Sequence, residues 1–252
     1  MNDATIDWAR APLGAGVKLL RAHPCGLAAL DKPAGLLSHP NRAGEEERSL
    51  LTVRYREKLE CFVWTGDDGG ECRVWLLHRL DSATSGVILV ATNPSVVAAV
   101  RTAFENRRVN KRYLAVVLGH SRERRALWRD DIDVQRSGTK VRAEKIGGMQ
   151  AETDMRCLRL LPGPPALSVL ELQPHTGRTH QLRLQCSRRH LPILGDQNYG
   201  NFARNRDLAR RFGTERLFLH ARSVELEFTL GAEKISFAAE SPEPAEFAAL
   251  AK

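Results

Sequence analysis

The sequence HRLDSATSG at residues 78–86, between the apolar runs VWLL at 74–77 and VILVA at 87–91, is the stretch that decides the fold. The flanking runs are short and rich in β-branched, aromatic and Leu residues, and the segment between them is polar, so the pattern predicts strand, turn, strand. Asp81 thus lies on a loop between two rigid elements, where a scaffold presents reactive groups. Two interpretations are open here: a reactive Asp81, or an Asp81 that caps the turn and pairs with Arg79.

Five other segments join this one in a recognisable order. The five segments are LDKPAGLLSHP at 30–40, VNKRYLA at 109–115, PHTGRTHQLR at 174–183, PILGDQNYG at 192–200 and LHA at 219–221. Together with residues 78–86 they resemble the motifs of the RluA-type pseudouridine synthases, with Asp31 where the family usually has Asn and Ser38 where it usually has Val.

The resemblance implies that the protein converts uridine to pseudouridine in RNA, with three catalytic residues. Asp81 matches the catalytic carboxylate, which acts at C1′ of the sugar or adds to the base ring. Tyr113 matches the active-site tyrosine, a stacking platform and a proton-transfer group. Arg183 matches the basic partner of the catalytic carboxylate. A guanidinium suits this role, because it binds a carboxylate through two parallel hydrogen bonds and stays charged when buried.

A second set of residues is expected to bind the substrate. Arg79 lies two residues before Asp81 and is expected to fill the gap left by a flipped nucleotide, or to hold a neighbouring phosphate. The other expected substrate-binding residues are His78, Lys111, Arg178, His180 and Gln181. The family often has His two residues after the arginine of the third motif, where this chain has Gln185. This departure puts local packing or an RNA contact in doubt.

No cofactor or metal is expected. The reaction is an isomerisation, and the sequence has no Gly-rich phosphate loop and no metal-ligand cluster of suitable spacing. His180, Cys186 and His190 lack a fourth ligand. A nucleoside-directed glycosidase is a competing hypothesis, but it needs a second acidic residue near Asp81. The nearest candidate, Asp196, is better explained as a turn residue.

Composition favours a polyanionic partner, and the resemblance implies that this partner is RNA. The chain of 252 residues has a formal net charge of +8 and a pI near 9.6, which suits a polyanion. Structured RNA, ribosomal or transfer, is the expected partner, and a catalytically idle RNA-binding protein is the alternative function. No membrane association is expected, and the five cysteines without a close pair fit a cytoplasmic protein with reduced thiols. We expect a monomer.

The resemblance implies an α+β fold: a mainly antiparallel mixed β-sheet flanked by helices, with an active-site cleft across it. Residues 1–15 are predicted to be an extension, wrapped over the domain or loose, and residues 16–252 one catalytic domain without an S4 domain. Helices are expected from Ser49 to about Cys61, from Asn93–Pro94 onward and in the basic segment from Arg204 to Arg216, and Thr179 is expected to cap another helix. Residues 120–148 read as a polar excursion with a strand fragment at 132–134.

Overall fold

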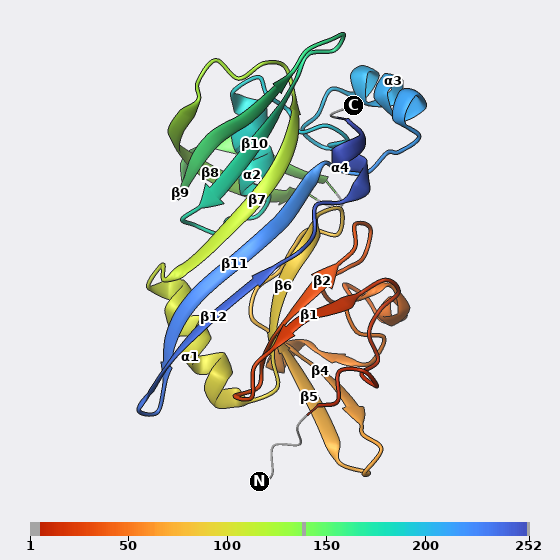
Figure 1. Ribbon diagram of the computed structural model, residues 1–252, viewed down its shortest axis with the longest axis vertical. Coiled ribbons are helices and arrows are strands. Elements are labelled where there is room, and N and C mark those ends of the chain that lie inside the picture. The colour runs from red at the N-terminus through yellow and green to blue at the C-terminus, as the bar shows by residue number, and fades with distance from the viewer. Residues whose placement is uncertain (1–5, 138–139, 251–252) are drawn as a thin grey trace. The chain divides into compact units, whose positions relative to one another are not determined.

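The structure, a computed structural model, describes residues 6–137 and 140–250, and the chain divides into two compact units (Figure 1). Unit 1 takes the residues up to Val109 together with Ala221–Pro242, and unit 2 takes Asn110–His220 and the residues from Glu243 on. Each unit is built on antiparallel strands with helices, so the predicted α+β class is confirmed. That residues 16–252 form one catalytic domain stays a prediction.

Unit 1 is organised around strand β6 (Ser85–Ala91), whose seven residues are all buried. Strand β2 (Leu27–Lys32) pairs antiparallel with it along its whole length, from Leu27 opposite Ala91 to Lys32 opposite Gly86. Strand β5 pairs with the carboxyl end of β6, and β11 is another neighbour of β6. The remaining strands extend the sheet as hairpins: β1 (Lys18–Ala22) on β2, β3 (Tyr55–Arg56) on β4 (Cys61–Thr65), β4 on β5 (Glu71–Leu76), and β12 (Glu233–Glu240) on β11 (Leu219–Leu230).

Helix α1 (Pro94–Glu105) confirms the predicted helix after Asn93–Pro94. The Asn93 side chain accepts the backbone N–H of Ser95, and Pro94 needs no N–H in the first turn. Its buried residues recur at helical spacing and pack on the apolar face of β2, β6, β11 and β12 (Figure 1). These buried residues are Val96, Val97, Val100 and Ala103.

The helix predicted from Ser49 to Cys61 is wrong. Two single 3-10 turns, Glu46–Arg48 and Glu57–Leu59, flank the short strand β3. The apolar residues of this segment have near-helical spacing, but their partners are strands: Leu51 bridges Leu13, and Phe62 on β4 lies between β3 and β5. Strand pairing with distant residues therefore overrides the local pattern.

The described part of the amino-terminal extension is wrapped over unit 1. The N–H of Gly14 donates to the carbonyl of Leu50 at 2.9 Å, and the N–H of Thr52 donates to Pro12 at 2.8 Å. Residues 1–5 lie outside the described residues.

Unit 2 contains four antiparallel strands in the order β7, β10, β9, β8. Their bounds are β7 Val109–Leu118, β8 Arg125–Ser137, β9 Lys140–Leu161 and β10 Leu167–Pro174. The polar excursion predicted for 120–148 is instead largely a long β8–β9 hairpin. The basal part of this hairpin buries Trp128, Ile132, Ala151, Thr153 and Met155. Strand β7 begins at Val109, four residues before Tyr113.

The helices of unit 2 are α2 (Gln181–Arg188), α3 (Phe202–Phe212) and the short α4 (Ala245–Ala249). Helix α3 confirms the helix expected in the basic segment from Arg204 to Arg216, but it ends at Phe212. Asn201 caps it by accepting the N–H of Arg204. The prediction that Thr179 caps α2 is wrong. His180 occupies the N-cap position in the left-handed region and makes no side-chain cap bond.

We predict that Gly86→Ala destabilises the protein far more than Gly35→Ala. Both glycines have positive φ, 110° and 89°, which costs an L-residue about 1–2 kcal/mol. A Cβ on Gly86 would lie 2.1 Å from the carbonyl oxygen of Ala221, whereas a Cβ on Gly35 meets nothing within 4 Å. The clash should bring the loss for Gly86→Ala to more than about 3 kcal/mol. Urea unfolding of both variants measures the difference, and equal losses would contradict the prediction.

Candidate active site

The loop that carries Asp81 is fixed by backbone hydrogen bonds. The hydroxyl of Ser38 accepts the N–H of Leu80 at 3.1 Å and donates to the carbonyl of Leu80 at 2.8 Å. The carbonyl of Asp81 accepts the N–H of Thr84 at 3.0 Å and closes the turn. Leu80 is buried, and the side chain of Asp81 is half-buried. The backbone carbonyl of Asp81 thus takes part in the turn.

A buried lysine joins the first motif to this loop. Lys32 is fully buried, and its ammonium donates to the carbonyls of Pro33, Leu36 and Ser82 at 3.1, 2.7 and 3.1 Å. The N–H of Gly35 adds a bond of 2.8 Å to the same carbonyl of Ser82. Because each ammonium proton can point at one acceptor, Lys32 ties residues 33–36 to the residue that follows Asp81.

His78 and Arg79 point to different surroundings. The Nε2 of His78 accepts the N–H of Leu89 at 3.0 Å, and its ring contacts Phe104 with 5.6 Å between centroids. Arg79 is exposed, and its NH1 lies 3.2 Å from Nε2 of His39, whose ring stacks on Tyr55 at 4.8 Å. His78 is therefore engaged in packing, and Arg79 stands at the surface beside an aromatic stack.

In unit 2, Lys111 and Tyr113 lie on strand β7. Residues two apart on a strand point to the same face, and both side chains are half-buried. Tyr113 is opposite Leu172 of β10. The Lys111 Nζ lies 4.0 Å from the position that a Cβ on Gly177 would take. Burial lowers the pKa of Lys111 to about 8.

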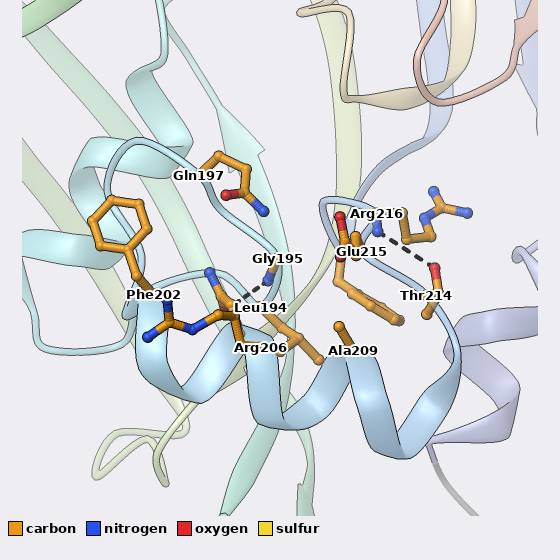
Figure 2. Close-up of a pocket in the computed structure, with 11 residues that line it drawn as sticks. Leu194, Gly195, Gln197, Phe202, Arg206, Ala209, Thr214, Glu215 and Arg216 are labelled. Atoms are coloured by element: carbon orange, nitrogen blue, oxygen red, sulfur yellow. Dashed lines mark hydrogen bonds between the residues drawn. The ribbon is translucent and has the colours of Figure 1, made fainter.

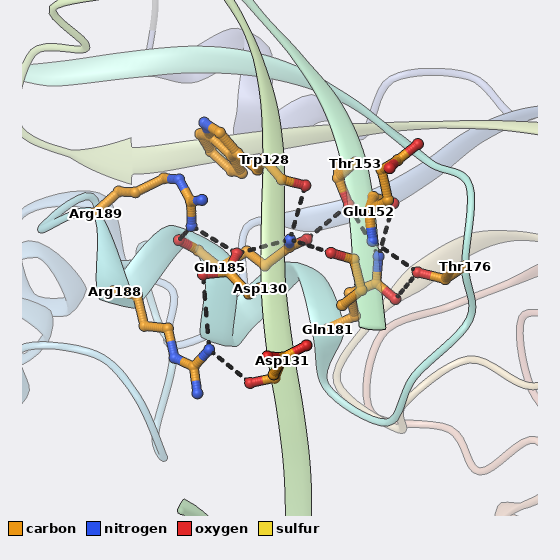
Figure 3. A network of polar contacts seen from close by, with 11 residues as sticks. Trp128, Asp130, Asp131, Glu152, Thr153, Thr176, Gln181, Gln185, Arg188 and Arg189 are labelled. Atoms are coloured by element: carbon orange, nitrogen blue, oxygen red, sulfur yellow. Dashed lines mark hydrogen bonds and ion pairs between the residues drawn. The ribbon is translucent and has the colours of Figure 1, made fainter. Parts of the chain in front are cut away.

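The third motif is organised by the buried amide of Gln181 (Figure 3). Its Oε1 accepts from the Thr176 hydroxyl at 2.7 Å and from the Arg178 N–H at 3.0 Å. Its Nε2 donates to the Glu152 carbonyl at 3.1 Å and to the Thr153 hydroxyl at 2.9 Å. These four bonds use the donors and acceptors of one amide, so Gln181 holds the loop. This geometry does not favour the substrate contact predicted for Gln181.

Gln185, the departure from the family pattern, fills a fully buried position one helical turn beyond Gln181 (Figure 3). Its Oε1 accepts from the Thr153 hydroxyl at 2.6 Å, and its Nε2 donates to Asp130 at 2.9 Å. Asp130 also pairs with Arg189 at 2.9 Å. The amide therefore connects α2 to β8 and β9, and the packing that the departure put in doubt is satisfied.

Arg183 forms a buried ion pair with Asp196. Its Nε and NH2 donate to the two carboxylate oxygens, both at 2.8 Å, and both side chains are at least 93% buried. Burial alone would raise the pKa of Asp196, but the bonds from Arg183 and from the N–H groups of Tyr199 and Asn198 outweigh it and hold that pKa below its usual range. The Arg183 guanidinium also lies 5.2 Å from the centre of the Tyr199 ring.

The expectation that Asp196 fixes a turn is confirmed, since it accepts the two N–H groups that follow it. Its second role, as counter-charge to Arg183, was missed. The sequence offered one signal for it, because Asp196 lies in a family-like segment. Asp81 belongs to unit 1 and Arg183 and Tyr113 to unit 2. The pairing of Arg183 with Asp81 stays a prediction.

The other residues predicted to bind substrate lie on the same loop of unit 2. Arg178 is half-buried, and its Nε lies 3.4 Å from the Gln150 carbonyl oxygen. The Nδ1 of His180 lies 2.9 Å from the hydroxyl of Tyr199. In the described part of the chain, no group of three His, Cys, Asp or Glu side chains is arranged to hold a metal ion, and no helix is long and apolar enough to cross a membrane.

Comparison with known proteins identifies the class. Residues 26–188 match the sequence profile of the RNA pseudouridylate synthases, and the chain belongs to this family. The protein is thus an RNA pseudouridine synthase, an isomerase. Among individual relatives, the chain is 32% identical to the tRNA pseudouridine synthase C of Haemophilus influenzae over 84% of this chain and 88% of that protein. It is 32% identical to the enzyme of the same name from Pasteurella multocida over 84% and 87%.

Solved structures share the fold. The human RNA pseudouridylate synthase domain containing 1 superposes with a TM-score of 0.64 at 24% identity, covering 90% of this chain and 84% of that one. The human domain containing 4 gives 0.64 at 23% identity, with coverage of 92% and 90%.

We predict that Asp196→Asn lowers the free energy of unfolding by about 3–5 kcal/mol, because it removes the charged partner that binds the buried Arg183 through both oxygens. An asparagine keeps an oxygen for the two backbone N–H groups, so the change isolates the charge. The double variant Arg183→Met/Asp196→Asn should recover part of this loss, since the guanidinium that lost its partner is removed as well. Urea unfolding of both single variants and the double variant measures the coupling. Purely additive losses would contradict the prediction.

Proposed function

We propose that Asp81 is the catalytic carboxylate and that transfer RNA is the substrate. The catalytic role of Asp81 is supported by the hydrogen bonds that hold its loop. The Ser38 hydroxyl binds the backbone of Leu80, and the buried ammonium of Lys32 binds the carbonyl of Ser82. The Asp81 carboxylate is half-buried, and the residues before and after it are held by these hydrogen bonds. A reactive group needs to be held in this way by its surroundings. The second part rests on the relatives named tRNA pseudouridine synthase C, which the chain matches over most of its length.

The reaction is balanced without another reagent. The N1–C1′ bond of uridine breaks, the base turns, C5 bonds to C1′, a proton leaves C5 and N1 gains a proton. Asp81 attacks C1′ or adds to the base ring, and both routes need it ionised. Tyr113 stacks against the base and moves the proton, and Arg183 stabilises the anionic carboxylate. No cofactor takes part in this scheme.

The cationic residues bind the RNA backbone and occupy the gap left by the flipped nucleotide. Arg79 is exposed and lies two residues before Asp81. It fills the gap left by the flipped uridine. Flipping costs a few kcal/mol in paired RNA and less in a loop, so a stem-loop is the favoured target. Lys111 and Arg178 contact phosphates. A transfer RNA substrate places the enzyme in the cytoplasm, and we propose that it acts as a monomer.

We predict that Asp81→Asn abolishes turnover and changes RNA affinity by less than about tenfold, because binding rests on distributed phosphate contacts. The measurement is release of tritium from transfer RNA and ribosomal RNA labelled at C5 of uridine, prepared from cells that lack the enzyme. Ser82→Ala is the control, since Ser82 holds the loop through its carbonyl and exposes its side chain.

Release from transfer RNA alone, lost in Asp81→Asn and kept in Ser82→Ala, supports both parts of the proposal. Release from ribosomal RNA alone would overturn the substrate assignment. Near-normal release by Asp81→Asn would overturn the catalytic assignment. Tight RNA binding without release from either RNA would favour the catalytically idle alternative.

The pKa of Lys111 gives a pH prediction. The amine is protonated below a pH of about 8 and neutral above it, because burial disfavours the charged form. If Lys111 contacts a phosphate, RNA affinity falls as the pH rises from 7 to 9, and Lys111→Arg removes this fall because arginine stays charged. Fluorescence anisotropy with labelled transfer RNA at constant ionic strength measures both curves. Superimposable curves for the two proteins would contradict the prediction.

A further inference from the structure

Unit 2 contains a cavity of about 190 Å³ beneath helix α3, lined in part by Leu194, Gly195 and Gln197 of the family-like segment 192–200 (Figure 2). Its floor is apolar: Leu194 and Phe218 are each 2% exposed, and Ala209 of α3 lines the cavity as well. Pockets for drug-sized ligands measure roughly 300–1,000 Å³, so this cavity is suited to a single planar ring system.

The rim of the cavity carries an exposed aromatic ring and polar groups that can form hydrogen bonds. Phe202, at the start of α3, is 54% exposed, which is unusual for a large apolar side chain. Gln197, Arg206 and Glu215 are exposed at the rim. Figure 2 shows Phe202 and Arg206 extending from α3, and Glu215 on the loop at the other end. The rim thus combines an aromatic face, a cation, an amide and a carboxylate.

The charge of α3 favours an anionic partner. Four exposed arginines lie on it: Arg204, Arg206, Arg210 and Arg211. Arg210 pairs with Asp207, and Arg211 donates to the carbonyl of Pro164, whereas Arg206 stands at the cavity. Cations beside a ring that can stack are the combination with which proteins bind single-stranded nucleic acid.

We propose that this cavity is a second RNA site, which takes one unpaired base of the substrate RNA. Phe202 stacks on the base, Arg206 binds a flanking phosphate, and Gln197 and Glu215 reach the base edge. An ionised carboxylate accepts hydrogen bonds and cannot donate one, so Glu215 favours a base with an amino or imino N–H on its exposed edge. The inference rests on the family membership, and it does not depend on the roles proposed for Asp81, Tyr113 and Arg183.

One wall of the cavity is hydrogen-bonded to the segment that contains Asp196 of the buried ion pair. Asn205 of α3 accepts the N–H of Gly195 at 3.1 Å and donates to the carbonyl of Asp196 at 3.0 Å. A base seated against Leu194 and Gly195 therefore contacts the segment that holds the counter-charge of Arg183. An RNA bound at this site is held close to the Arg183–Asp196 pair within the same unit, so loss of the site should raise KM more than it lowers kcat.

The first test is RNA affinity of the full chain, with the RNA that it modifies. Phe202→Ala should weaken binding roughly 5- to 100-fold, the effect of losing one base stack. Ala209→Met fills the cavity without a change of charge and should weaken binding in the same range. Arg206→Ala should lower the slope of log K against log salt by about 0.7, the value for one phosphate contact on a single strand.

Arg210→Ala is the matched control, because it removes an exposed charge from the same helix outside the cavity. It should change affinity by less than about twofold. Equal losses in Arg206→Ala and Arg210→Ala, together with wild-type affinity in Phe202→Ala and Ala209→Met, would overturn the proposal and leave a diffuse electrostatic surface.

The second test identifies the bound nucleotide. A photoreactive benzoylphenylalanine in place of Phe202 should crosslink to one discrete, unpaired nucleotide of the RNA, and the same group in place of Arg210 should not. Crosslinks spread over many nucleotides, or their complete loss in the presence of excess free nucleoside monophosphates, would overturn the assignment to RNA.

This inference and the proposed function can fail separately. Turnover that Asp81→Asn abolishes, combined with no effect of the cavity variants, would overturn the second site alone. A discrete crosslink at position 202, combined with full activity of Asp81→Asn, would overturn the catalytic assignment alone.

Discussion

The buried ion pair between Arg183 and Asp196 is the interaction on which much of unit 2 depends. A charge taken out of water is stable only if its partner and its remaining hydrogen bonds are all supplied. The carboxylate binds the guanidinium through both oxygens, and the backbone after Asp196 supplies further donors. Tyr199 lies over the guanidinium and contacts His180 at the start of α2, and Asn205 connects the same segment to α3. One charge pair thus fixes two helices and the turn between them.

Unit 1 meets the same constraint with neutral acceptors. The ammonium of Lys32 is fully buried and binds backbone carbonyls, among them the carbonyl of Ser82, fifty residues away in the sequence. The lysine therefore fixes the loop that carries Asp81, the residue just before Ser82.

The sequence predicted the elements whose signals are local, and it failed where distant residues decide. Asn93 and Pro94 predicted the start of α1 because capping depends on adjacent residues. The helix after Ser49 was wrong because its apolar residues pair with strands elsewhere in unit 1. Thr179 fits a cap by residue type, but His180 adopts the left-handed region and Gln181 accepts the N–H of Arg178 instead. A long hairpin with few apolar residues left too weak a pattern to detect.

For the candidate site, residue type indicated the chemistry, and the partner had to come from the structure. An arginine in the third motif predicts a carboxylate partner, and the chain offers both Asp81 and Asp196. The pair with Asp196 occupies the Nε and NH2 of the guanidinium, which has five N–H donors in all. The residue type of Arg183 thus predicted a carboxylate partner, and the structure shows that Asp196 is one such partner.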